Sequence, residues 1–169
     1  MVNSPILIPP RLRNGDGVTI KEDNEMAEYS NSAVQTITAG GNALFTNEPS
    51  PCTRGYIMHR DDSGIFTVRG IVNNPCATFA RYVVDFGSNI AVPTGGTVGA
   101  ISVALAIDGE PIPASTMIVT PAAVEEYFNV HRSIEIAVPR GCCYVIAIEN
   151  TSDQSILMQN ANIRIVRTA

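Results

Sequence analysis

Residues 97–107 read TVGAISVALAI, and their side chains alternate between large and small. The large side chains occupy every second position and are those of Ile101, Val103, Leu105 and Ile107. The small ones between them are those of Ala100, Ser102, Ala104 and Ala106. A repeat of two predicts a β-strand, because successive side chains of a strand point to opposite faces. We expect the large face to enter a core and the small face to allow close approach by another chain.

Short segments of this kind recur from Ser32 onward and are separated by Gly, Pro, Asn and Asp. They predict roughly eight to ten strands at spacings of about ten residues, which is typical of an antiparallel sandwich. The expected strands include 33–38, 65–70, 78–86, 97–107, 124–138 and 157–166. No long segment has the helical periodicity that βαβ units need. The sequence therefore predicts an all-β fold.

The composition is that of a folded domain with an acidic charge balance. Hydrophobic residues make up 45% of the chain and charged residues 16%, with a formal net charge of -5. A nucleic-acid partner is not expected, because binding to phosphates needs a basic face. No apolar run approaches the roughly 18–20 residues that span a bilayer, so we expect no membrane contact. The short apolar segment near the N-terminus precedes Arg11 and Arg13, which does not fit a signal peptide, so assembly in the cytoplasm is expected.

Residues 1–32 differ from the rest of the chain. They contain three prolines and an acidic run of Glu22, Asp23, Glu25 and Glu28. Both features argue against a packed element. We interpret 1–32 as an extended N-terminal arm and 33–169 as the folded domain, and a helical turn at 26–29 stays open as an alternative. The residues expected to attach the arm to a larger assembly are Pro5, Ile6, Leu7, Ile8, Arg11 and Arg13.

The sequence shows no converging set of catalytic or metal-binding residues. Cys52, Cys76 and the adjacent pair at 142–143 form no C-x-x-C motif, so we predict small buried side chains, with a Cys52–Cys76 bridge as the alternative. His59 and the two aspartates at 61 and 62 lie next to a turn glycine, which favours a solvated turn. We therefore predict no catalytic residues, no metal site and no cofactor.

Six motifs between Gly40 and Arg167 resemble the C1q/TNF-like jelly-roll family, in its bacterial and phage branch. They are Gly-Gly-x-x-x-Phe ending at Phe45, DSGIFTV from 62, ALAIDGEPIPAS from 104, IEIAVPRG from 134, IENTS from 148 and IRIV from 163. The branch includes phage structural proteins and the C-terminal domains of spore-surface collagen-like proteins. The resemblance implies a jelly roll that forms a homotrimer, and the motifs record turns and strands without any chemistry.

The resemblance also implies that the last strand lies near the threefold axis. Asn160, Asn162 and Arg164 are then expected at the subunit contact, together with the small face at Ala100, Ser102 and Ala104. In that strand we expect Leu157, Ala161, Ile163 and Ile165 to face the core, and Met158 to face away.

The resemblance allows two functions, and the sequence of the region before the domain distinguishes between them. Residues 1–32 contain no Gly-X-Y stalk of the kind that spore-surface members carry, which favours a phage virion protein. We expect a trimeric capsid decoration or cement protein, with itself and the major capsid protein or another shell protein as partners. The alternative is a host- or glycan-binding head domain of a phage fibre or spore filament, with loops 47–53 and 73–76 as the recognition elements.

Overall fold

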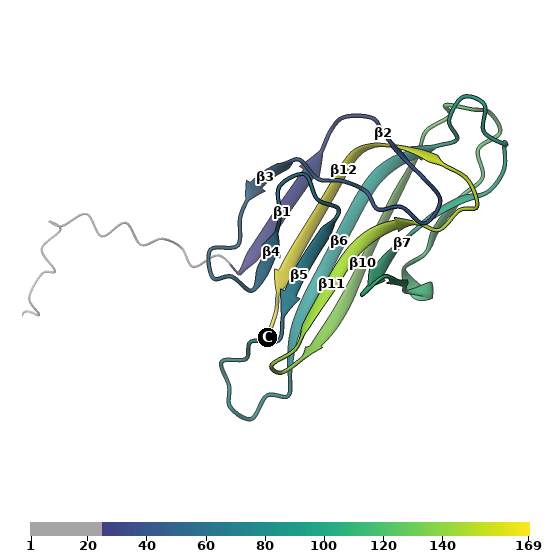
Figure 1. The fold of residues 1–169 in the computed structure, drawn as a ribbon. Coiled ribbons are helices and arrows are strands. Elements are labelled where there is room, and N and C mark those ends of the chain that lie inside the picture. The colour runs from purple at the N-terminus through teal and green to yellow at the C-terminus, as the bar shows by residue number, and fades with distance from the viewer. Residues whose placement is uncertain (1–24) are drawn as a thin grey trace, which may run out of the picture.

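The computed structural model describes residues 25–169, which form two antiparallel β-sheets packed face to face (Figure 1). The first sheet has the order β10 (Phe128–Pro139), β6 (Phe79–Ala91), β12 (Ile156–Arg167), β1 (Met26–Asn31) and β3 (Asn47–Ser50), and β2 (Gln35–Ile37) also pairs with β12. The second has the order β4 (Ile57–His59), β5 (Ile65–Arg69), β11 (Cys143–Asn150), β7 (Ile101–Ile107) and β8 (Glu110–Pro111), and β9 (Met117–Val119) also pairs with β7. A 3-10 turn, η1 (Pro113–Ser115), follows β8. The predicted all-β antiparallel sandwich is confirmed.

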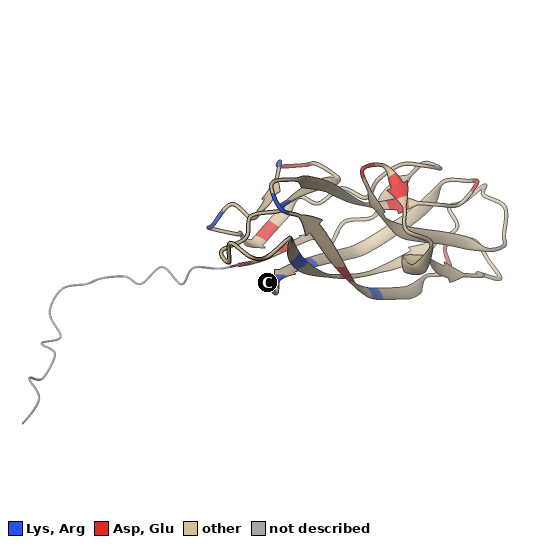
Figure 2. Cartoon of the chain, turned by 90° about the horizontal axis from the view of Figure 1, so that it is seen from below, with Lys and Arg blue, Asp and Glu red and all other residues tan. Residues whose placement is uncertain are grey.

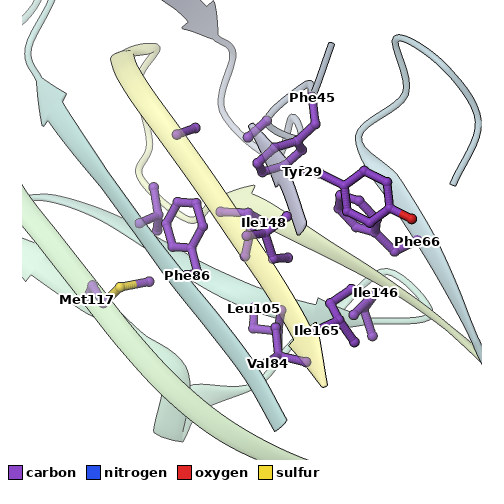
Figure 3. Close-up of a cluster of buried hydrophobic side chains, with 14 of the residues drawn as sticks. Tyr29, Phe45, Phe66, Val84, Phe86, Leu105, Met117, Ile146, Ile148 and Ile165 are labelled. Atoms are coloured by element: carbon purple, nitrogen blue, oxygen red, sulfur yellow. The ribbon is translucent and has the colours of Figure 1, made fainter. Parts of the chain in front are cut away.

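The alternating stretch at 97–107 contributes strand β7 (Ile101–Ile107) to the second sheet, where it pairs with β11. Ile101, Val103 and Leu105 enter the core, as their alternation predicted, and Ile107 packs against its margin. They share one buried cluster with side chains of the first sheet such as Phe86 and Val84, and Figure 3 shows Leu105 close to Val84 in that cluster. Residues 97–100 lie before the strand and are not part of the sheet.

An aromatic group fills the part of the core between β1 and β5. The ring centroid of Phe66 lies 4.8 Å from that of Tyr29 and 5.2 Å from that of Phe45 (Figure 3). All three side chains are at most 1% exposed. Tilted and edge-on arrangements of this kind are the preferred geometries of aromatic pairs. Residues 29 and 45 thus anchor the N-terminal part of the described chain to the second sheet.

The start of the folded body differs from the prediction. Residues 26–31 form strand β1, which pairs with both β12 and β3, so the helical turn at this place is wrong. Ala27 and Tyr29 point into the core, while Glu28 and Ser30 alternate with them on the outer side. The acidic residues of this segment therefore mark one face of a strand, and the folded domain includes residues that we had assigned to the arm.

The facing of β12 also differs from the prediction over its first half. The register of β12 against β6 shifts between Gln159 and Asn162, and Asn160 adopts a φ of 53°. Such a bulge adds one residue to the strand and reverses the facing of everything before it. Met158 is consequently buried and Leu157 only half-buried, the reverse of our expectation, whereas the core residues after the bulge face inward as predicted.

The sandwich has two ends, and a different set of connections lies at each. At the entry end, β1 begins and β12 finishes, and the connections 51–56, 70–78 and 140–142 lie there. At the distal end, β6 finishes and β12 begins, with the connections 92–100, 120–127 and 151–155. Figure 1 shows these two ends at the lower left and upper right of the body. No helix among residues 25–169 is long and apolar enough to cross a membrane.

Candidate interaction surfaces

The chain enters the body at Glu25, which is held by two arginines. Its carboxylate lies 3.3 Å from Nη1 of Arg54 and 3.4 Å from Nη1 of Arg167, and its carbonyl accepts a hydrogen bond from the backbone N–H of Arg167 at 3.0 Å. Figure 2 shows the C-terminus and the first described residues at this end, with basic positions around them. The point at which the preceding residues join the body is therefore fixed by charged groups from two other segments.

Arg167 is a buried charge, since only 3% of its side chain is exposed. Its guanidinium lies 4.2 Å from the ring centroid of Tyr56, and its Nη2 donates to the carbonyl of Ile71 at 2.9 Å. Its Nε finds no hydrogen-bond partner among residues 25–169. Removing an arginine from water is unfavourable, and the nearby carboxylate, ring and carbonyl offset that penalty only in part.

Tyr82, in strand β6 of the first sheet, links the two sheets at the same end. Its hydroxyl donates to the carbonyl of Arg69 in the second sheet at 2.6 Å, and its side chain is fully buried. Burial raises the pKa of Tyr82 to about 12, although the charge of Arg167 acts in the opposite direction. Loss of water around the phenol is thus the larger effect.

The outer face of the first sheet carries the predicted contact residues of β12. Asn162 is half-buried, and its Nδ2 donates to a carboxylate oxygen of Glu28 at 2.7 Å. Arg164 is exposed, lies opposite Asp85 in the register of β6, and brings its Nε to 3.2 Å from the sulfur of Met26. The four polar residues of this group form a polar surface next to the exposed Asn160; they are Asn162, Glu28, Arg164 and Asp85.

The other predicted contact residues belong to the second sheet. Ala100 is exposed just before β7, whereas Ser102 is half-buried and its hydroxyl lies 2.7 Å from that of Thr151. Ala104 is fully buried within the chain itself, so its side chain has no surface to offer a partner. The structure therefore does not bring this set together with the β12 residues, because the two lie on opposite sheets.

The predicted attachment residues, Pro5, Ile6, Leu7, Ile8, Arg11 and Arg13, lie outside the described residues. The loops of the alternative function lie within them. Residues 47–50 form β3, an edge strand whose following connection reaches the entry end, and 73–76 belong to the connection before β6 at the same end. The connection that follows β3 and residues 73–76 therefore lie at the same end of the sandwich as the point where the chain enters the body.

The distal end carries an open polar cleft of two adjoining parts. One part, of about 330 Å³, is lined by residues 97–100 with Asp153 and Gln154, and the other, of about 310 Å³, by residues 93–97 with 154–155. The side-chain amide of Gln154 joins the two loops, since it accepts from the N–H of Thr97 at 2.9 Å and donates to its carbonyl at 2.7 Å.

Asn150 lies beneath this cleft and is fully buried at the end of β11. Its Nδ2 donates to the carbonyls of Ile37, Thr38 and Gln154 at 3.0, 3.1 and 2.8 Å, and its Oδ1 accepts from the N–H of Ser152 at 2.9 Å. One amide thus connects the end of β11 to two backbone segments, 37–38 and 152–154.

Sequence reasoning overlooked both Asn150 and Arg167, although the strand alternation contained the signal. Asn150 continues the core-facing series of Ile146 and Ile148 in β11, and Arg167 continues that of Ile163 and Ile165 in β12. A polar residue in the core-facing phase at a strand end predicts a buried polar contact.

The histidine and aspartate group around the β4–β5 turn is structural. The ring centroid of His59 lies 4.6 Å from those of both Tyr29 and Phe66, and its Nε2 lies 3.0 Å from the carbonyl oxygen of Ser63. Asp61 and Asp62 are exposed in the turn itself. Within residues 25–169, no three or more His, Cys, Asp or Glu side chains are grouped to hold a metal ion.

The cysteines differ from the prediction of small buried side chains. Only Cys52 is half-buried and packs against the core, whereas Cys76, Cys142 and Cys143 are exposed free thiols. The alternative bridge between residues 52 and 76 is therefore not formed. The prediction was wrong because these positions lie in turns and at a strand start, where the alternation of a strand does not determine burial.

Two sheets with this strand order define a jelly-roll sandwich, and solved structures of that class resemble it. No protein-family model and no curated protein matches the chain. A TNF of S. frugiperda, Eiger, has a TM-score of 0.60 and 12% identity, and the match covers 85% of this chain and 92% of that one. The globular domain of zebrafish complement 1qA protein has a TM-score of 0.51 and 11% identity, with 84% and 95% covered.

Vertex protein P5 of PRD1 also matches, with a TM-score of 0.41 and 10% identity over 85% of this chain and 96% of that one. The first two matches establish that this chain has a C1q/TNF-like jelly-roll fold, as the sequence motifs predicted. Identities of this size speak for the fold alone, so the bacterial and phage branch stays a prediction.

Proposed function

We propose that this chain is a non-enzymatic structural protein of a bacteriophage virion, a homotrimer that decorates or cements the capsid through the residues preceding Glu25. The observation that carries the proposal is the fixed entry point, where Arg54 and Arg167 hold the Glu25 carboxylate. Because Glu25 is fixed to the folded domain, an attachment segment that precedes it would hold the whole domain on the shell. The partner is the major capsid protein or another shell protein.

The homotrimer is supported by the outer face of the first sheet. Along β12 and its neighbours this face presents Asn160, Asn162, Arg164, Asp85 and Glu28, which include both signs of charge and several amide groups. A surface of this kind can match a second copy through reciprocal hydrogen bonds and opposite charges, which give specificity more than affinity. Trimerisation would also triple the attachment segments, so that weak contacts add through effective concentration.

The direct test is a chain that lacks residues 2–24. This deletion spares β1, whereas a deletion that continued to residue 30 would remove a strand of the first sheet. We expect the truncated protein to sediment as a trimer and to lose its binding to particles that lack the native protein, measured by co-sedimentation and electron microscopy. Coating of particles at the native level by the truncated protein would contradict the attachment role, and a stable single chain in solution would contradict the trimer.

The position of the alternative recognition loops favours attachment over a receptor-binding head. Loops 47–53 and 73–76 lie at the entry end, beside the junction with the proposed attachment segment. In a decorated particle this end would face the shell. A loop that recognises a host molecule needs to face away from it.

A further inference from the structure

Three exposed thiols lie at the entry end of the body. Cys76 belongs to the connection between β5 and β6, and Cys142 and Cys143 belong to the turn between β10 and β11. Free cysteine is among the most buried residue types, and exposed free thiols are avoided on stable surfaces. Three of them at one end of a small domain therefore need an explanation beyond packing.

The two connections that carry these thiols are joined to each other by hydrogen bonds. The N–H of Gly70 donates to the carbonyl of Cys142 at 2.8 Å, and the N–H of Gly141 donates to the carbonyl of Gly70 at 2.9 Å. The backbone N–H of Arg140 donates to the carbonyl of Thr78 at 2.8 Å, and its Nη1 donates to that of Pro75 at 2.7 Å. The thiols are thus presented from one hydrogen-bonded unit.

The space around Gly70 shows how closely this unit is packed. A Cβ atom placed on Gly70 would lie 1.9 Å from the carbonyl oxygen of Pro139 and 3.1 Å from that of Cys142. Both obstacles are backbone atoms, which cannot move aside as a flexible side chain would. The two connections that carry the thiols are therefore tightly packed against each other.

None of these thiols is bonded to another inside the chain, since all three are free. Cys142 and Cys143 are adjacent, and a disulfide between neighbouring residues strains the S–S geometry. Cys143 begins strand β11 on the outer face of the second sheet, opposite Arg69 in the register with β5, whereas Cys76 lies in the connection that leads into the first sheet. Their natural reaction partner is a thiol of another molecule.

We propose that these three thiols form disulfide bonds between copies of the chain, which lock the assembled oligomer covalently at its entry end. The inference rests on the self-association in the proposed function, since only copies that are held together present these ends to one another repeatedly. Such a bond would keep neighbouring attachment segments together after assembly.

The oxidant is a small anionic disulfide of the glutathione class. A thiolate on one copy attacks the small disulfide, which forms a mixed disulfide and releases one small thiolate. A thiolate of the neighbouring copy then attacks the protein sulfur of the mixed disulfide, which forms the S–S bond between copies and releases the second small thiolate. Two protein thiols are oxidised, one small disulfide is reduced, and the two protons pass to the released thiolates. The guanidinium groups of Arg69 and Arg140 lie on the same unit and would attract the anionic reagent.

The test treats the full chain with glutathione disulfide and compares non-reducing electrophoresis with sedimentation in reducing buffer. We expect covalent dimers and trimers whose rate of formation is unchanged over about a tenfold range of protein concentration, because reaction within an assembled oligomer depends on effective and not bulk concentration. A variant with C76S, C142S and C143S together should lose these species. The matched control C52S, at the half-buried cysteine, should keep them.

Three results would overturn the inference. A bridge within one chain, a stable glutathione adduct without any bond between copies, or cross-linking that rises in proportion to protein concentration would each do so. If the chain sediments as a trimer in reducing buffer and none of the expected bonds forms, only this inference fails. If it sediments as a single chain in reducing buffer, the proposed function fails first.

Discussion

Two buried polar side chains hold opposite ends of the sandwich, and they do so with different chemistry. At the distal end, the neutral amide of Asn150 makes four hydrogen bonds to backbone groups of other residues. At the entry end, the charged Arg167 contacts a carboxylate, an aromatic ring and a carbonyl, and its Nε finds no partner among residues 25–169. The first side chain is fully satisfied, and the second is not.

This difference indicates that the contacts of Asn150 are purely structural, whereas those of Arg167 also hold the point where the preceding residues join the body. A buried amide with all its hydrogen bonds made stabilises the fold, since its own polar atoms and the backbone groups that depend on it would otherwise be left unpaired. A buried charge in a half-satisfied site is a weaker source of stability, because removing it from water is itself unfavourable. We therefore interpret Arg167 mainly as the residue that fixes Glu25, where the preceding residues join the body.

The largest effect that we expect comes from Asn150→Leu. Leucine is larger than asparagine and cannot form hydrogen bonds, so the carbonyls of Ile37, Thr38 and Gln154 lose their shared donor and the buried site must also accommodate extra bulk. We expect the free energy of unfolding to fall by about 3–5 kcal/mol, since each buried unpaired group carries roughly 1–3 kcal/mol. Denaturant titration measures it, with the exposed Asn73→Leu as a control that should stay within about 0.5 kcal/mol of the parent chain. A loss below about 1 kcal/mol for the first variant would mean that water replaces the amide.

A smaller effect is expected from Arg167→Met, which keeps an apolar stem beneath Tyr56. The variant loses the contacts to Glu25 and Ile71 but also removes the penalty of a buried charge, and Arg54 still holds the carboxylate. We expect a loss of about 1–3 kcal/mol by the same titration. The matched control is Arg81→Met, whose ion pair with Glu135 is half-exposed and should contribute at most about 1 kcal/mol. A loss for Arg167→Met as large as that for Asn150→Leu would break the distinction between the two ends.

The sequence predicted the class of fold and most of the core-facing sets, because alternation along a strand records which side chains are buried. It misjudged β12 at one place, since the bulge at Asn160 is a property of the backbone that no hydrophobic pattern marks. It misjudged β1 because charge and proline nearby outweighed the alternation of Ala27 and Tyr29 with Glu28 and Ser30.

The interaction surfaces were harder to predict than the fold. The small side chains at 104 and 106 predicted close approach by a neighbour, and the structure shows both to be buried within the same chain. The exposed thiols were missed because the burial of a residue in a connection depends on tertiary packing, which no local pattern encodes. Which segments share an end of the sandwich follows only from the strand order.

The smallest effect concerns alkaline pH and a third buried polar group, Tyr82 at the entry end. Its pKa of about 12 in the folded chain lies above the value of about 10 for an exposed tyrosine, so the folded state favours the neutral phenol. Its contribution to stability is therefore complete below about pH 10 and is lost as the pH rises toward about 12. By about pH 11 the loss amounts to roughly 1.4 kcal/mol.

The measurement is the free energy of unfolding as a function of pH, for the parent chain and for Tyr82→Phe. The variant lacks the hydrogen bond to the carbonyl of Arg69, so it should be less stable near neutral pH but should lose less stability between about pH 10 and 11. Some loss should remain, because burial also raises the pKa of Tyr29. Identical pH dependence in the two proteins would show that the entry end admits water to the phenol. In that case the contacts of Arg167 would be solvated too, which would sharpen their contrast with the fully buried amide of Asn150.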